Sequence, residues 1–348
     1  MRNIFTFVLC LGLLIGHNSF AQNIAKTDTN PGTQASTGSA EKNENSNSLS
    51  QAYDIEDLKK KATEGDVDAQ LNLGYIYLYG IDGNNVDYKQ ALTYYEMAAE
   101  QNSAVAYNNL GSLYFSGIGT DVDYPKAIHF FEEATKLGSY DAAVTLAIIQ
   151  LGDTSHPKTA EEYEKILELL TMAEPENNIA KYLLGYSYMT GFLVKQNYKK
   201  AFSLIKASAD DKYDEAQYIL ADFYINGWGT TKNYTQAVNS LSAAVQQGNA
   251  DAMMKLADIL SEGKIYKKDI NRAHILYNVA SVNGAQDAAQ KRDQLEENLK
   301  IEDLLVIQAK AENYKPNPSD KTKFIRQTYG NSLKSYIDSN ITKETLKK

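Results

Sequence analysis

The residues that could do chemistry are few and lie far apart along the chain. Beyond residue 21 there are three histidines, and none has a second ligand at the spacing that a metal site needs. The sequence contains no Cys–His cluster, H-E-x-x-H, Walker loop or G-x-S-x-G motif. We therefore expect no metal, no cofactor and no catalytic residue, and a chain that is not an enzyme. The histidines are His129, His156 and His274.

Two partial motif matches do not change this expectation. Ser203 and Lys206 match the S-x-x-K of penicillin-recognising enzymes, but the companion motifs are missing. The glycine pairs at 117–119 and 227–229 follow predicted helices, whereas the glycines of a dinucleotide site follow a strand. We interpret Ser203 and Lys206 as helix residues and the glycines as loop residues.

The composition favours a packed, acidic protein. The chain of 348 residues has a formal net charge of −9, which argues against a protein that coats nucleic acid, because phosphate neutralisation needs a basic surface. Apolar residues make up 43% of the chain, which is enough to build a core. Tyrosine is the unusual residue, with 25 Tyr against 10 Phe and 1 Trp, so a large ring with a polar tip recurs through the structure.

The first 50 residues predict an export signal followed by a tether. Residues 4–15 are an apolar run shorter than the roughly 20 residues of a membrane-spanning helix, and the small-x-small pattern that ends at Ala21 is typical of a secretory signal peptide. We expect residues 1–21 to be removed by cleavage between Ala21 and Gln22, and no later segment to span a membrane. Residues 22–50 are rich in Asn, Ser, Thr and Gly and predict a disordered linker.

The single cysteine, Cys10, lies inside the predicted signal. A lipid anchor on Cys10 is the alternative, but Leu9 stands where a bacterial lipoprotein signal needs a small residue. Without Cys10 the exported chain has no cysteine, so its stability in an oxidising compartment must come from packing.

A repeat of about 36 residues organises the chain from residue 54 onward. Each unit has an early alanine, then a leucine four residues later, a small residue next to it, an aromatic residue at the eighth position in most units and a glycine at the eleventh. The alanine, the leucine and the aromatic residue lie at offsets 0, 4 and 8, which share one helix face, and the glycine predicts a left-handed helix end. The alanines are Ala69, Ala106, Ala142, Ala180, Ala216, Ala252 and Ala288.

A second helix is predicted after the glycine loop of each unit. It begins at an Asp or Asn, whose short side-chain oxygen can accept a hydrogen bond from an unpaired backbone N–H. Each unit is therefore predicted to be an antiparallel helix pair, and a stack of such pairs is an all-α solenoid in which no unit is stable alone. The predicted N-caps are Asp87, Asp123, Asn197, Asn233 and Asp269.

The combined pattern resembles the Sel-one-like repeat (SLR) family, a relative of the tetratricopeptide repeat. The resemblance rests on the stretches 65–80 (GDVDAQLNLGYIYLYG), 106–119, 180–191 and 216–229. The tetratricopeptide repeat fits less well, because its period is about 34 and it lacks the glycine loop. The resemblance implies an α/α superhelix, a right-handed solenoid of about six antiparallel helix hairpins within residues 51–312, with a capping helix at each end.

Two parts of the chain depart from the repeat. The third unit lacks the tyrosine and the glycine, and Ile166 replaces the small residue of its second helix. We interpret this as drift, with a change of curvature or a bulge that carries a contact as the alternative. After a predicted helical run at 291–316, residues 313–348 hold eight basic against three acidic residues and predict a solvated basic tail, with a nucleic-acid or lipid contact as the alternative.

The remaining functional candidate is a surface. Solenoids bind along the concave face lined by the first helix of each unit, and by analogy with tetratricopeptide arrays this face presents positions two, six and sometimes ten after the alanine. Tyrosine suits binding because it brings a large area and few rotamers; the alternative is that these tyrosines belong to the core. The candidate protein-binding residues are Tyr75, Tyr79, Tyr182, Tyr186, Tyr218, Asp222 and Asp258.

These observations predict an exported, monomeric, non-catalytic scaffold that binds a protein or peptide and no nucleic acid. The resemblance to exported SLR proteins implies work on the bacterial cell envelope, from the periplasm, or a secreted role in virulence toward a host. Two alternatives stay open: a hydrolase of the β-lactamase-like type known from cysteine-rich members, and a eukaryotic secretory-pathway adaptor. The lack of cysteine after residue 10 weakens the first, and the lack of a membrane anchor and of a retention signal weakens the second.

Overall fold

The computed structural model describes residues 54–81, 84–153, 156–297 and 299–329. The predicted signal peptide at 1–21, the predicted linker at 22–50 and the end of the predicted tail lie outside these ranges. Sixteen helices and no strand occur in the described residues, which confirms the all-α class. None of these helices is long and apolar enough to cross a membrane.

The helices belong to two compact units, which divide between residues 146 and 147, inside α8 (Tyr140–Gly152). Before α8, unit 1 contains α3 (Ile55–Thr63), α4 (Val67–Tyr79), α5 (Tyr88–Ala99), α6 (Ala104–Ser116) and α7 (Tyr124–Lys136). After α8, unit 2 contains α9 (Ala160–Ala173), α10 (Asn178–Thr190), α11 (Tyr198–Asp210), α12 (Asp214–Asn226), α13 (Tyr234–Gln246), α14 (Ala250–Glu262), α15 (Ile270–Val282), α16 (Ala288–Glu296), α17 (Ile301–Glu312) and α18 (Asp320–Tyr329).

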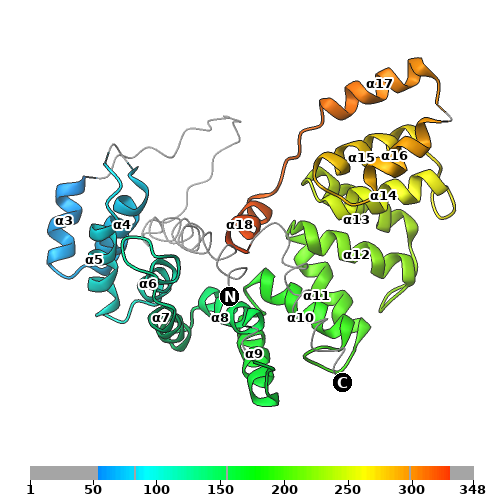
Figure 1. The fold of residues 1–348 in the computed structure, drawn as a ribbon. Coiled ribbons are helices and arrows are strands. Elements are labelled where there is room, and N and C mark those ends of the chain that lie inside the picture. Colours follow the sequence, from blue (N-terminus) through cyan, green and yellow to red (C-terminus); the bar gives the residue numbers. More distant parts are fainter. Residues whose placement is uncertain (1–53, 82–83, 154–155, 298, 330–348) are drawn as a thin grey trace, which may run out of the picture. The chain divides into compact units, whose positions relative to one another are not determined.

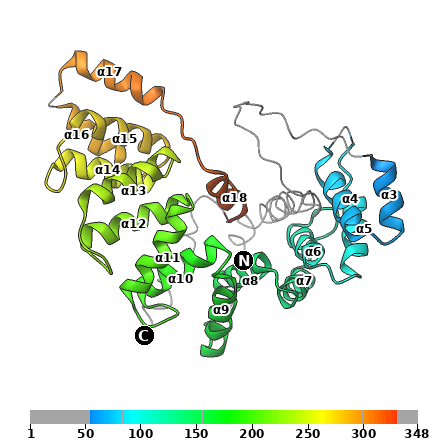
Figure 2. The same cartoon turned by 180° about the vertical axis from the view of Figure 1, so that it is seen from behind.

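Helical hairpins are the building block of both units. In unit 1, α4 packs against α5 and α6 against α7, and in unit 2 the pairs are α10 with α11, α12 with α13 and α14 with α15 (Figures 1 and 2). Second helices also contact the first helix that follows them, as α5 does with α6, α11 with α12 and α13 with α14. This repeated stacking confirms the predicted array of helix pairs.

The predicted helix boundaries are confirmed by their hydrogen bonds. The side chain of each predicted N-cap accepts a backbone N–H from the first turn; Asn233 Oδ1, for example, accepts from Gln236 N at 3.0 Å. The predicted terminal glycines have left-handed φ values of 66° to 78°. These glycines are Gly80, Gly117, Gly191, Gly227 and Gly263.

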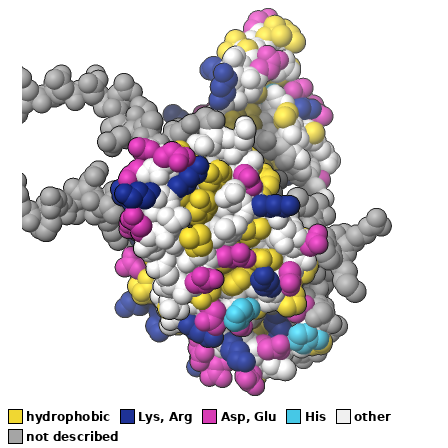
Figure 3. All heavy atoms as spheres, turned by 90° about the vertical axis from the view of Figure 1, so that its left-hand side faces the viewer, with side chains coloured by type: hydrophobic (Ala, Val, Ile, Leu, Met, Phe, Trp, Pro, Cys, Tyr) yellow, Lys and Arg dark blue, Asp and Glu magenta, His cyan; other side chains and the backbone are white. Residues whose placement is uncertain are grey.

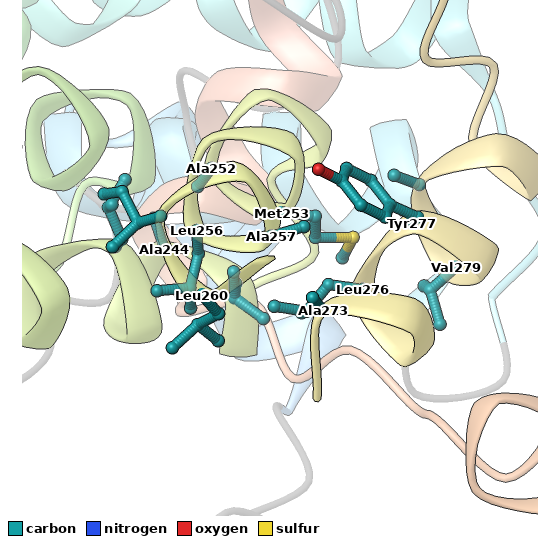
Figure 4. Packing of buried hydrophobic residues seen from close by; sticks show 14 of the residues in the cluster. Ala244, Ala252, Met253, Leu256, Ala257, Leu260, Ala273, Leu276, Tyr277 and Val279 are labelled. Atoms are coloured by element: carbon teal, nitrogen blue, oxygen red, sulfur yellow. The ribbon is translucent and has the colours of Figure 1, made fainter. Parts of the chain in front are cut away.

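The small residue in the middle of each first helix lets the second helix approach closely. A Cβ added at Gly111 would lie 2.8 Å from the ring of Phe131, and one at Gly74 would lie 2.6 Å from the ring of Tyr95. Where this position holds alanine, as in Ala257, the methyl group is itself buried in the core of the hairpin (Figure 4).

The turns between successive repeats share one conformation. In all of them except the turn between α9 and α10, one residue after the second helix has a positive φ, between 60° and 94°. Asn102 and Lys212 adopt this left-handed conformation without being glycine. The set consists of Gly65, Asn102, Gly138, Lys212, Gly248 and Gly284.

The third repeat keeps two helices, α8 and α9, although its sequence departs from the pattern. Helix α9 begins with a capping box, in which Thr159 N donates to Glu162 Oε2 at 2.7 Å and Glu162 N donates to Thr159 Oγ1 at 3.3 Å. The bond from the Thr159 backbone, with a further contact to His156, lowers the pKa of Glu162 to about 2. Ile166 is fully buried, so it fills the place of the missing small residue.

The C-terminal part differs from the sequence-based expectation. The predicted run at 291–316 is two helices, α16 and α17, and α17 packs on α15. Residues of the predicted solvated tail then form an extended segment and helix α18 (Figure 1). Thr322 and Ile325 of α18 are buried, at 0% and 4% exposure. The contacts that bury them join residues distant in sequence, so local composition gave no sign of them.

Candidate protein-binding face

In unit 1 the candidate residues lie on α4, where they form a tyrosine pair. The rings of Tyr75 and Tyr79 are one helical turn apart, with centroids 4.7 Å apart and tilted by 54°. Tyr75 is buried at 9% exposure, and burial together with the neighbouring Tyr75 raises the pKa of Tyr79. The Tyr79 phenol therefore stays protonated at neutral pH and can donate a hydrogen bond.

In unit 2 the first candidate pair lies on α10 and is more deeply packed. Tyr182 is fully buried and Tyr186 is 9% exposed. The ring of Tyr182 forms a T-shaped contact with the ring of Tyr213, just before α12 begins, with the ring centroids 5.0 Å apart. Tyr213 donates to Glu215 Oε2 at 2.9 Å, and burial raises the pKa of Tyr213 well above its usual value. Tyr182 thus contributes to the packing between repeats, and a binding role for it remains a prediction.

The remaining candidates are partly exposed and carry charge. Asp222 on α12 forms an ion pair with Lys255 on α14, with 2.5 Å between Oδ1 and Nζ. The same ammonium group lies 4.8 Å from the centroid of the Tyr218 ring, one turn before Asp222. Lys255 is therefore held by a carboxylate and a ring that both belong to the preceding repeat.

The same pairing recurs one repeat later. Asp258 on α14 forms an ion pair with Lys291 on α16 at 2.6 Å. Tyr277 on α15 donates to Asp258 Oδ1 at 2.7 Å, and its ring lies 5.8 Å from the Lys291 ammonium. Burial of Tyr277, reinforced by the hydrogen bond to Asp258, raises its pKa, although a contact with Ser261 acts in the opposite direction.

We call Asp222, Lys255, Asp258 and Lys291 the Asp–Lys ladder. Their side chains are between 27% and 41% exposed, so they are held in place yet open to a ligand. Sequence reasoning identified the aspartates but not the lysines. The signal was present, because Lys255 and Lys291 each stand three residues after a repeat alanine and thirty-three after their aspartate.

The residues first considered for catalysis are not brought together. His274 is fully buried and contacts Glu296 at 2.7 Å. Ser203 is exposed, and Lys206 pairs with Asp210 on its own helix at 2.5 Å. Within the described ranges, no group of three or more His, Cys, Asp or Glu side chains could hold a metal ion. On the face drawn in Figure 3, acidic and basic side chains are interspersed among hydrophobic ones.

Comparison with known proteins finds the same repeat. The sequence model of the Sel1 repeat matches residues 67–103, 104–139, 178–213, 214–249 and 250–281. These five matches correspond to the hairpins α4–α5, α6–α7, α10–α11, α12–α13 and α14–α15. The helices α8 and α9 of the divergent third repeat fall in the interval that the model does not match.

Solved structures share the fold. The uropathogenic Escherichia coli protein c5321, a protective antigen with an SLR fold, superposes with a TM-score of 0.65 at 23% identity, over 84% of this chain and 59% of that protein. A Sel1 repeat protein from Oxalobacter formigenes superposes with a TM-score of 0.55 at 24% identity, over 67% of this chain and 96% of that protein.

Curated relatives match over shorter stretches. The sel1-like repeat-containing protein L21 of Acanthamoeba polyphaga mimivirus is 30% identical over 135 residues, which is 38% of this chain and 24% of that protein. A Sel1-like repeat-containing protein of Schizosaccharomyces pombe, C1B3.10c, is 37% identical over 83 residues, or 24% of this chain and 12% of that protein. The chain thus spans a quarter or less of these relatives.

Proposed function

This chain belongs to the Sel1 repeat family, and on that premise we propose that it is a non-catalytic scaffold that binds a protein or peptide partner. The partner lies along the first helices of unit 2, on Tyr218 and the Asp–Lys ladder. The observation that carries this proposal is the ladder itself, in which the same ion pair recurs one repeat apart and remains partly exposed.

The ladder suits a partner that is longer than one repeat. Its alternating carboxylates and ammonium groups are fixed by rings and by each other, so little side-chain entropy is lost when a ligand binds. Partly exposed ion pairs contribute little to stability, typically about 0–1 kcal/mol each, so keeping the fold intact does not require them. A bound peptide with charged or hydrogen-bonding groups at the repeat spacing would replace one weak Asp–Lys ion pair by two contacts of its own, one to the aspartate and one to the lysine.

The test is crosslinking affinity purification from the native organism with the full chain as bait. Tyr218→Ala with Asp222→Ala should reduce recovery of the partner at least about tenfold, equivalent to about 1.4 kcal/mol. The matched control is Lys199→Ala with Ser203→Ala, two exposed positions on the second helix α11. Equal recovery with both double variants would show that the partner binds elsewhere. Tyr182→Ala with Tyr186→Ala tests the deeper pair, with circular dichroism to check the fold.

We also propose that the chain is exported, with cleavage between Ala21 and Gln22, and acts as a monomer in the bacterial cell envelope or after release toward a host. This proposal rests on the sequence, because residues 1–21 lie outside the described ranges. Cell fractionation distinguishes the periplasmic from the released protein, and light scattering measures the oligomeric state.

A further inference from the structure

The segment after α17 lies across two neighbouring inter-repeat turns of unit 2, like a bound peptide. We call residues 313–326 the strap. Its extended part forms backbone contacts with the end of α13: Asn317 N donates to Gln246 O at 2.7 Å, and the Tyr314 hydroxyl donates to Val245 O. Pro316 lies against Gly248, where an added Cβ would approach the proline ring to 2.8 Å.

Four polar side chains at the start of α18 and within it contact the turns, and one of them is Lys321, which forms an ion pair with Asp211. Ser319 Oγ donates to Lys212 O at 2.7 Å, and Thr322 Oγ1 donates to Gln247 Oε1 at 2.6 Å. Arg326 Nη2 donates to Asp214 Oδ2 at 2.6 Å in an ion pair. Ser319, which directly precedes α18, and Thr322 and Arg326 within it have the spacing i, i+3 and i+7, which places them on one side of the helix.

The surface that receives the strap is assembled by the repeats themselves. Gln247 Nε2 donates to Gln217 Oε1 at 2.8 Å and to Lys212 O at 3.1 Å. Unit 1 contains the matching bond, from Gln101 Nε2 to Gln70 Oε1 at 2.9 Å. The glutamine pair is therefore a feature of the repeat that forms without the strap, and it leaves the Gln247 carbonyl oxygen to accept from Thr322 and from Ser319 N.

Because of the buried carboxylate of Asp214, this surface needs a positively charged group in its ligand. Its carboxylate is 2% exposed and receives one amide bond, from Asn249 Nδ2 at 3.0 Å, besides the bond from Arg326. Its other oxygen, Oδ1, is buried without a hydrogen-bond partner among the described residues. A carboxylate so far from water needs a cation, and a planar guanidinium suits it because it carries charge and several donors together.

We propose that Lys212, Asp214, Gln247, Gly248 and Asn249 form a peptide-recognition site, separate from the Asp–Lys ladder, and that the strap is its intrachain ligand. The ligand class is a segment of the form Pro-x-x-Ser-x-x-Thr-x-x-x-Arg that turns helical at the serine. The strap binds reversibly, because its helix is fixed mainly by hydrogen bonds and by two ion pairs, Arg326 with Asp214 and Lys321 with Asp211, with Ile325 as a buried apolar anchor. The inference does not depend on the function proposed above.

In the first experiment, a free peptide with the strap sequence competes with the tethered strap for the proposed recognition site. A labelled synthetic peptide of residues 313–329 is titrated into the full-length wild type and into full-length Ser319→Ala/Thr322→Ala/Arg326→Ala. In the wild type the tethered strap competes at an effective concentration in the millimolar range, so the triple variant should bind the peptide at least about tenfold more tightly. Adding Asp214→Asn to the triple variant should remove that gain. Equal binding to wild type and triple variant, or no binding to either, would show that the strap is a fixed part of the fold.

A second pair of variants keeps the proposal testable if the triple variant unfolds. Gly248 and Gly284 have nearly the same φ, 84° and 82°, but only at Gly248 would an added Cβ meet a neighbour within 4 Å, the strap residue Pro316. Gly248→Ala should therefore raise amide hydrogen exchange of residues 320–326 at least about tenfold, while Gly284→Ala should leave it unchanged. The same exchange in both variants would overturn the proposal of a displaceable strap.

Discussion

At the scale of single residues, the close contact between helices depends on the size of one side chain in each hairpin. Gly111 faces Phe131 and Gly185 faces Ile205, and an added Cβ would come within 3 Å in both cases. The sequence showed that this position is always small. It did not show which residue faces it, because the partner lies on the following helix and is recognisable only once the pairing of the helices is known.

We expect Gly111→Ala to destabilise unit 1 even though alanine is the better helix former. Alanine gains about 1 kcal/mol of helix propensity, but overpacking against Phe131 costs about 1–3 kcal/mol, so the free energy of unfolding should fall by up to about 2 kcal/mol. Urea denaturation measures the change. Phe131→Leu should rescue Gly111→Ala with a coupling of about 1 kcal/mol or more, because leucine removes the ring that the methyl group meets. A coupling near zero would contradict this account.

At the scale of elements, the repeat was predictable because its boundaries are set by local chemistry. An N-cap needs an oxygen within a few residues of the first turn, and a left-handed helix end favours glycine, so both are visible in sequence. The third repeat was harder, because α9 uses a capping box at Thr159 and not the usual Asp or Asn. The ladder lysines and the strap contacts were missed because each joins separate repeats; Arg326 and Asp214 are 112 residues apart.

The N-caps give an element-scale prediction. Asn233→Ala should lower the free energy of unfolding by about 1 kcal/mol, because the Gln236 N–H loses its side-chain acceptor at the start of α13. Asn233→Asp keeps an acceptor and should cost much less. Thermal unfolding of the two variants beside the wild type provides the measurement. Equal losses for alanine and aspartate would show that the hydrogen bond does not stabilise the helix.

At the scale of the whole molecule, the chain is an array of hairpins and not the two ordinary globular domains that its length alone would suggest. The division into two compact units falls in α8, within the repeat that the Sel1 model does not match. The sequence periodicity predicted the array because each repeat packs in the same way. It could not predict where the array divides, since that depends on how well neighbouring repeats pack.

The proposed export gives a whole-molecule prediction. Intact mass analysis of the protein purified from its native organism should show a chain that begins at Gln22. Ala21→Leu should prevent this cleavage, because the signal-peptide pattern requires a small residue there, and the larger precursor should accumulate. Ser50→Leu, a change outside the predicted signal, is the control. A mature wild-type protein that keeps residues 1–21 would exclude the proposed signal.

The shared left-handed turn has a consequence for how such a gene can change. Because the inter-repeat turns other than that between α9 and α10 take the same conformation at the same place, a duplication or deletion of one whole period between them joins two ends that already fit each other. The array can therefore lengthen or shorten by recombination without new junctions having to evolve. The turns at Lys212 and Gly248 are the exception. The strap spans both, so a period inserted between them would separate Asp214 from Gln247 and leave the strap able to reach only one.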